Sequence, residues 1–189
     1  MEDILRNIRL HIQTLCKEKE QVLIAIDGRC GAGKTTLADR LQQTIECNVI
    51  HMDDFFLRPE QRTIERMNKA GENVDDERFE QEVLRPLQLK QAFFYRPYDC
   101  KTQKLQSGIY VRPRQVNIME GSYRCHPNLS PYYDLKIFLT VDRKLQLQRI
   151  AGRNGGVSIE LFREKWIPLE ENYFLTYDIE KTCDLSFQT

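Results

Sequence analysis

The sequence predicts an α/β protein in which a doubly wound parallel β-sheet is flanked by helices. Short apolar runs alternate with stretches whose apolar residues recur at helical spacing, which is typical of strand–helix–strand units. A glycine-rich segment, residues 28–36, lies between the first predicted strand and its helix. The chain has 189 residues, enough for one domain with a sizeable core, and we expect a single domain over residues 1–189.

The predicted elements follow in chain order. Residues 1–19 form an N-terminal helix, because the apolar residues within 3–18 fall on one stripe. A buried strand over 21–27 leads through the glycine-rich segment into a helix over 36–45. A second buried strand over 48–52 ends in two aspartates. Residues 57–73 are polar and form a loop with about one helical turn. Asp75 or Asp76 then begins a helix that Pro86 is expected to end or bend.

The second half of the chain continues the alternation. Residues 90–113 form an insertion whose segments 93–98 and 109–111 are expected to pair as a small antiparallel hairpin outside the main sheet. Further strands are predicted at 116–119, at 135–141 before a helix capped by Asp142, and at the edge over 183–187. Helical spacing places Phe162, Trp166, Leu169 and Tyr173 on one face, which we expect to lie in the core.

Composition narrows the class of partner. Lys and Arg balance Asp and Glu at 28 each, so no basic surplus favours nucleic acid. No apolar run approaches the ~20 residues that cross a bilayer, and the N-terminus lacks a signal peptide. None of the six cysteines forms a Cys-x-x-Cys pair, which is typical of reduced cytosolic thiols. We therefore expect a cytoplasmic protein with a small-molecule substrate, as a monomer or as a homo-oligomer.

The glycine-rich segment carries the clearest functional signal. Gly28 to Thr36 fits the phosphate-binding pattern G-x-x-x-x-G-K-[ST]. The start of a helix has unpaired N–H groups, and glycines let the backbone approach phosphate oxygens closely. Lys34 can reach the β- and γ-phosphates of ATP, and the Thr35 hydroxyl can bind Mg²⁺. The predicted nucleotide contacts are Gly28, Cys30, Gly31, Ala32, Gly33, Lys34, Thr35 and Thr36.

Carboxylates follow two of the predicted strands. Ligands of open α/β sheets lie beyond the carboxyl ends of the strands, which places Asp53 or Asp54 beside the glycine loop. Asp53 either accepts the proton of an attacking hydroxyl or helps to hold Mg²⁺ through water. Glu120 ends another apolar strand and is expected to hold a metal-bound water. The structural alternatives are a helix cap for Asp53 and a turn before Gly121 for Glu120.

A lid is predicted over residues 149–165. Arg149 and Arg153 lie four residues apart on one helix face, where they can neutralise a γ-phosphate. Asn154, Gly155 and Gly156 follow as a flexible turn. A solvated basic face is the alternative for each arginine.

An acceptor pocket is predicted beside the hairpin. Tyr98 and Asp99 lie in an aromatic, proline-containing stretch that can wall a pocket, and Asp75 or Asp99 can bond substrate hydroxyls. Helix capping by Asp75 and ordinary hairpin packing are the alternatives. The three histidines lack metal-ligand spacing, so no metal site is assigned to them.

In this order, the segments resemble the uridine kinase-like P-loop kinases, a group that includes phosphoribulokinases and one class of pantothenate kinases. The resemblance covers roughly residues 20–187. It is carried by residues 24–28, Gly33-Lys34-Thr35-Thr36, His51-Met52-Asp53-Asp54-Phe55-Phe56, Asn73-Val74-Asp75, Pro97-Tyr98-Asp99, Ile118-Met119-Glu120-Gly121, Ile167-Pro168 through Tyr173-Phe174, and Cys183-Asp184-Leu185. The glycine loop alone is shared by many nucleotide-binding proteins, whereas the ordered set is more specific.

The resemblance implies a P-loop NTPase fold with five parallel strands in the kinase-type order 2-3-1-4-5. It implies that Asp53 is the base and that Asp75 and Tyr98 contact a nucleoside. Arg149 and Arg153 match lid arginines, with a spacing one residue longer here. The family's lid usually has a Glu-Arg-Gly-Arg-like run where this chain has residues 154–157, and Gln103 stands where a histidine is usual.

The expected activity is transfer of the γ-phosphate of ATP to a hydroxyl of a nucleoside such as uridine or cytidine. Another small hydroxylated acceptor, such as pantothenate or a sugar phosphate, is the first alternative, and both departures from the family pattern favour it. A regulatory NTPase is the second alternative, and a kinase-like protein that binds nucleotide without transfer activity, suggested by the shortened lid, is the third. The chain lacks the N-K-x-D motif that would favour a guanine-specific switch.

Overall fold

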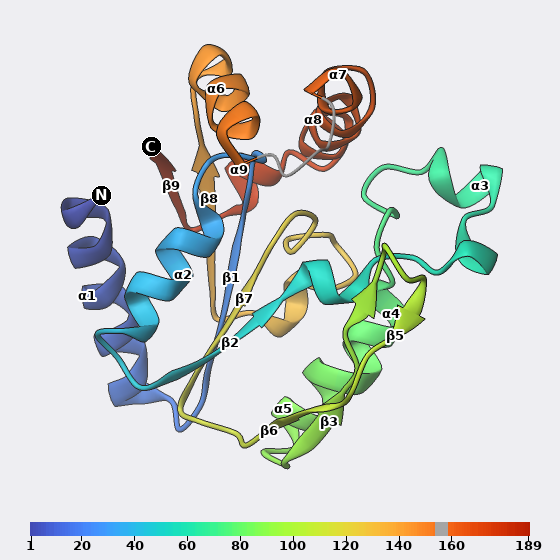
Figure 1. Ribbon diagram of the computed structural model, residues 1–189. Coiled ribbons are helices and arrows are strands. Elements are labelled where there is room, and N and C mark those ends of the chain that lie inside the picture. The colour runs from blue at the N-terminus through green and yellow to red at the C-terminus, as the bar shows by residue number, and fades with distance from the viewer. Residues whose placement is uncertain (154–158) are drawn as a thin grey trace.

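The computed structural model describes residues 1–153 and 159–189, without the side chain of Arg153. Its central sheet has five parallel strands in the order β2-β7-β1-β8-β9 (Figure 1). Their bounds are Val22–Gly28 (β1), Cys47–His51 (β2), Val116–Glu120 (β7), Leu135–Thr140 (β8) and Leu185–Gln188 (β9). Counted along the chain, these strands have the predicted order 2-3-1-4-5.

Apolar side chains cover both faces of this sheet, as the continuous apolar strands predict. On β1, Ile24 and Ile26 pack with α1 (Glu2–Glu18) and α2 (Lys34–Gln42). The alternate residues Leu23 and Ala25 face a second cluster, which includes Phe79 and Tyr173. In Figure 1, α1 and α2 lie on one side of the sheet and α4 and α5 on the other.

The chain between β2 and the second helical layer is more structured than predicted. A 3-10 turn, Met52–Phe55, follows β2, and the segment 56–74, called the arm below, contains a 3-10 turn at Pro59–Gln61 and α3 (Ile64–Met67). Asp75 then caps α4 (Asp76–Phe79), since its side chain accepts a hydrogen bond from the Arg78 backbone N–H at 3.2 Å. The predicted cap is therefore confirmed for Asp75.

The helical run does not end at Pro86 but continues to Gln88, so the first of the two predicted outcomes, an end of the helix at Pro86, is wrong. After α4 the backbone forms a π-helical turn, Glu80–Leu84, and then α5 (Arg85–Gln88). Proline has no N–H and its ring clashes with the carbonyl four residues earlier. The π-helical turn before Pro86 accommodates the missing N–H and the proline ring, and the helix continues.

The insertion lies outside the main sheet, as predicted, but it forms two antiparallel ribbons where one hairpin was expected. The first pairs β3 (Phe93–Tyr95) with β6 (Ile109–Val111), and the second pairs β4 (Tyr98–Asp99) with β5 (Lys104–Leu105). A 3-10 turn, Ser130–Tyr132, precedes β8.

The C-terminal part of the chain contains the remaining helices. Asp142 caps α6, since its carboxylate accepts from the N–H groups of Lys144 and Leu145 at 2.9 and 3.2 Å. The bounds are Arg143–Arg153 (α6), Ile159–Leu161 (α7), a π-helical turn Phe162–Trp166, Ile167–Thr176 (α8) and Ile179–Thr182 (α9). No helix within the described ranges has the length and apolar character needed to cross a membrane.

Candidate active site

The glycine loop joins the end of β1 to the start of α2 in a conformation that requires glycine. Gly28 has φ of +129°, and a Cβ there would lie 2.0 Å from the Leu139 carbonyl oxygen of the adjacent strand. Gly33 has φ of +90° and precedes the first turn of α2. The first N–H groups of a helix have no partner within it, so the loop presents donors to an anion.

Lys34 places its ammonium group within the loop. Its Nζ donates to the carbonyl oxygens of Gly28 and Arg29 at 2.5 and 3.2 Å. Of the predicted nucleotide contacts, Cys30, Gly31, Gly33, Lys34 and Thr35 line a cavity, while Gly28, Ala32 and Thr36 are outside its described lining. Five of the eight predicted nucleotide contacts therefore line the cavity directly.

Two strand ends bring Thr35, His51 and Glu120 together. The Thr35 hydroxyl donates to Glu120 Oε1 at 3.2 Å, and His51 Nδ1 lies 2.6 Å from the same oxygen. This hydrogen bond and the charge of Glu120 raise the pKa of His51, which favours the imidazolium form. Glu120 therefore lies beside the end of the glycine loop, and His51 is an additional member of the site.

Asp53 lies in the same cavity, in the 3-10 turn that follows β2. The Asp53 side chain is exposed to the cavity. The surrounding protein nevertheless removes part of its hydration, which raises the pKa of the carboxyl group, and the negative charge of Glu120 raises this pKa further. The charge of Lys34 opposes these effects. The neighbouring Asp54 accepts a hydrogen bond from the Tyr95 hydroxyl at 3.0 Å and is not among the described lining residues.

Thr35, Asp53 and Glu120 offer oxygen atoms of the kind that bind a magnesium ion. Mg²⁺ prefers hard oxygen ligands and is usually held by one or two carboxylates together with phosphate and water. Burial raises the pKa of Asp53, and the negative charge of the nearby Glu120 raises it further, which places two carboxylates close together here. In the described part of the chain, no three His, Cys, Asp or Glu residues form a metal cage by themselves.

Helix α8 is attached to the glycine loop through two acidic residues. Glu170 is buried and accepts from the Cys30 N–H at 2.9 Å and from the Ser122 hydroxyl at 2.6 Å. Glu171 forms a bidentate ion pair with Arg29, at 2.7 and 3.0 Å. Burial, followed by the charge of Glu170, raises the pKa of the Cys30 thiol to about 12, so the thiol is neutral.

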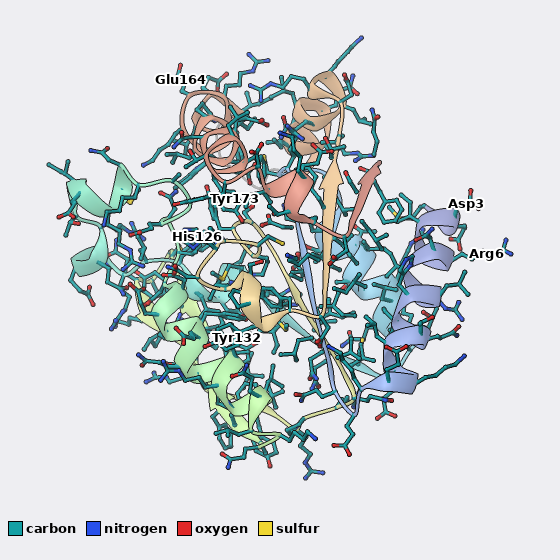
Figure 2. The ribbon with its side chains drawn as sticks, turned by 180° about the vertical axis from the view of Figure 1, so that it is seen from behind. Asp3, Arg6, His126, Tyr132, Glu164 and Tyr173 are labelled. Atoms are coloured by element: carbon teal, nitrogen blue, oxygen red, sulfur yellow. The ribbon has the colours of Figure 1, made fainter. Side chains whose placement is uncertain are left out.

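The fully buried Asp27 connects the loop to two other elements. It accepts hydrogen bonds from the backbone N–H groups of Gly28 and Cys125, at 2.7 and 2.8 Å, and from the Tyr173 hydroxyl at 2.8 Å. Figure 2 shows Tyr173 near His126, and their rings lie 6.3 Å apart. Burial raises the pKa of Asp27, and these donors oppose that shift.

Replacing Tyr173 by phenylalanine removes one donor from this buried carboxylate. We expect Tyr173→Phe to lower the free energy of unfolding by about 1.5–3 kcal/mol, the range for a hydrogen bond to a charged group. Urea unfolding followed by circular dichroism measures the change. Tyr177→Phe is the matched control, because the Tyr177 hydroxyl makes no hydrogen bond within the described structure. Equal stability of the two variants would contradict a stabilising role for the Tyr173–Asp27 bond.

The cavity has a volume of about 570 Å³ and extends away from the glycine loop toward the arm and the start of α8. Its polar end contains Lys34, Asp53 and Glu120. Apolar and aromatic side chains line the remainder: Met52, Phe56, Leu57, Met67, Val74, Tyr123, Phe162 and Trp166. The volume and mixed lining are typical of a site for a small molecule.

The three residues predicted to contact the acceptor are Asp75, Tyr98 and Asp99. None of them is among the described residues that line this cavity. Asp75 is buried, caps α4 and lies 3.5 Å from Arg78 and 3.9 Å from Arg58. Tyr98 is buried, and Asp99 accepts hydrogen bonds from the N–H groups of the turn that follows it.

The predicted lid is described only in part. Arg149 donates to the Gly31 carbonyl oxygen at 3.1 Å and to the Thr189 hydroxyl at 3.0 Å, which places its guanidinium against the glycine loop. The side chain of Arg153 and the predicted turn Asn154, Gly155 and Gly156 lie outside the described residues.

The sequence interpretation was wrong for two aromatic residues. Phe162 and Trp166 line the cavity and are half-buried, whereas Tyr173 on the same predicted face is in the core. The π-helical turn that contains both residues changes the angular spacing on which the prediction depended. The Pro168 that follows this turn is the available signal, since Pro86 follows the other π-helical turn in the same way.

No protein-family model matches the chain. A possible uridine kinase from Bacillus stearothermophilus is similar in structure, with a TM-score of 0.68 and 24% identity, over 96% of this chain and 99% of that one. A proposed fructose transport system kinase from Silicibacter sp. TM1040 has a TM-score of 0.70 and 23% identity, over 94% and 97%. A circularly permuted P-loop protein from Saccharomyces cerevisiae, described as a kinase, has a TM-score of 0.72 and 13% identity, over 98% and 99%. These likenesses agree with the strand order and identify the fold.

Proposed function

From its uridine kinase-like P-loop kinase fold, we propose that this protein is an ATP-dependent kinase for a small hydroxylated molecule. One observation carries the proposal: a single cavity of about 570 Å³ joins the glycine loop and Asp53 to an apolar compartment at the arm. A phosphate donor and an acceptor can therefore bind side by side in one open pocket. Direct transfer requires that the two substrates are held close together in one site.

Each residue has a role in this reaction. The acceptor oxygen forms a bond to the γ-phosphorus while the bond from that phosphorus to the β,γ-bridging oxygen breaks, which releases ADP. Asp53 takes the proton of the acceptor hydroxyl, and Lys34 stabilises negative charge on the transferring oxygens. Thr35 and Glu120 would hold Mg²⁺, alone or with Asp53. The ion supplies charge neutralisation and alignment of the phosphates.

Uridine and cytidine are the acceptors that the sequence resemblance suggests, and pantothenate and sugar phosphates are the alternatives. The decisive experiment measures ADP release from Mg-ATP in the presence of nucleosides, pantothenate, sugars, sugar phosphates and small hydroxy acids. We expect ADP release to depend on one class of acceptor. ATP hydrolysis that no acceptor accelerates would instead favour a nucleotide-dependent switch and contradict the proposal.

The raised pKa of Asp53 predicts the acid limb of the pH profile. Only the ionised carboxylate accepts a proton, so kcat/KM, which reports the groups of the free enzyme, is expected to fall as the pH falls through this pKa. An ordinary aspartate titrates near about 3.9, so the limb should lie above pH about 4. The measurement is kcat/KM for Mg-ATP against pH. A rate that stays constant down to pH about 4 would exclude Asp53 as the titrating base.

A further inference from the structure

Two cationic side chains line the cavity beyond the groups assigned to phosphate transfer. They are Arg62 on the arm and Lys165 in the π-helical turn before α8. The acidic lining residues Glu120 and Glu170 already accept hydrogen bonds next to the glycine loop. Within the described ranges, neither cation has a carboxylate oxygen within 4.0 Å.

The guanidinium of Arg62 is held in place by the backbone. Its Nε and Nη2 both donate to the Leu57 carbonyl oxygen, at 3.0 and 2.8 Å. The described structure gives Nη1 no hydrogen-bond partner. The other two arginines of the arm differ, because Arg58 faces Glu60 and Asp75 and Arg66 pairs with carboxylates of α4. Arg62 is therefore the arm arginine whose charge faces the cavity without neutralisation.

The ammonium group of Lys165 lies against the ring of Trp166. Its Nζ lies 4.9 Å from the centroid of the Trp166 ring, within the range of a cation–π contact. Phe162, Lys165 and Trp166 all line the cavity from one π-helical turn. The turn therefore combines an apolar surface with a positive charge at the same wall.

Asn73 adds a polar group that points to a ligand. It lines the cavity, yet only 6% of its surface is exposed, and both atoms of its side-chain amide lack a hydrogen-bond partner within the described structure. The amide is near enough to the Tyr123 hydroxyl to influence the pKa of that phenol, but without the geometry of a hydrogen bond. Buried amides are normally paired, so the missing partner of Asn73 is best supplied by a bound molecule.

We infer that the acceptor is a hydroxylated molecule with an anionic group, a carboxylate or a phosphate. Arg62 and Lys165 bind the anionic group, and Asn73 hydrogen-bonds the polar part of the molecule between that group and Asp53. This inference rests on the proposed kinase function and narrows its substrate class. It excludes a neutral nucleoside as the preferred acceptor.

Matched acceptor pairs test the substrate class. Pantothenate and pantothenyl alcohol, glycerate and glycerol, and ribulose 5-phosphate and ribulose differ within each pair only in the anionic group. ADP release from Mg-ATP should be stimulated more by the anionic member of a pair, and the KM of that member should rise with ionic strength. Equal stimulation by both members, or a preference for the neutral member or uridine, would overturn the inference and leave the proposed kinase function intact.

Substitutions test the two cations. Arg62→Gln and Lys165→Gln should each raise the KM for the anionic acceptor by about ten- to hundredfold, the loss typical of a charge-assisted contact. The KM for ATP should change by less than about twofold. Lys69→Gln on the arm and Arg163→Gln in the same π-helical turn are the controls, since both cations are outside the described cavity lining. A larger effect on the KM for ATP would instead assign the two cations to the triphosphate.

A binding measurement keeps the test independent of turnover. Trp166 is the one tryptophan of the chain and lines the cavity, so its fluorescence reports occupancy. With Mg-ADP present, inorganic phosphate should change this fluorescence saturably, and Arg62→Gln should weaken its binding by about tenfold or more. Unchanged phosphate affinity in the variant would overturn the inference. Failure of Mg-ADP itself to bind would instead refute the proposed kinase function.

Discussion

Replacing Asp53 by asparagine is expected to lower kcat by about 10²–10⁴, the usual contribution of a positioned general base. The substitution keeps the size of the side chain and removes its ability to take the acceptor proton. Binding of Mg-ATP depends mainly on Lys34 and the loop N–H groups, so the KM for ATP should change much less than kcat. Steady-state kinetics with the acceptor found in the screen separates the two parameters.

Asp54→Asn is the matched control for this experiment. Asp54 is adjacent in sequence but accepts a hydrogen bond from Tyr95 and is outside the described cavity lining. Its substitution should cost much less activity than that of Asp53. If Asp54→Asn were the inactive variant, the assignment of the base would have to move to Asp54.

Replacing Lys34 by methionine should lower kcat/KM by about 10²–10³, as does removal of a donor that stabilises transition-state charge. Methionine keeps most of the side-chain length but has no charge and cannot donate to an oxygen. Lys144→Met on the exposed face of α6 is the control and should retain full activity. Near-normal transfer by the Lys34 variant would disprove the assignment of the glycine loop.

The strands of the main sheet were predictable because each strand is specified by a short apolar run in the sequence. The apolar runs that form β1, β2, β7 and β8 each end within about one or two residues of their predicted bounds. The sharp turn at Gly28 follows from the spacing of the phosphate-binding pattern. The strand order came from the family resemblance, because local patterns do not specify which strands are neighbours.

The wall of the cavity was harder to predict, because it depends on pairings between distant segments. His51 lies opposite Glu120 in the register between β2 and β7, and only the strand order makes that pairing visible. Arg62 is recognisable as a cavity residue only after its neighbours Arg58 and Arg66 have been paired with carboxylates. A polar loop in the sequence gave no reason to distinguish one of its arginines from the others.

The two π-helical turns make the site sensitive to chain length. Each turn ends two residues before a proline, Pro86 in one helical run and Pro168 in the other. Each residue of an α-helix turns the chain by about 100° around the helix axis. Deleting one residue from the π-helical turn would restore α-helical geometry and rotate the residues that precede the deletion, relative to α8, by about that angle. Phe162 would then face away from the cavity, even if every remaining side chain were unchanged. The number of residues before Pro168 therefore helps to set which side chains form this wall of the cavity.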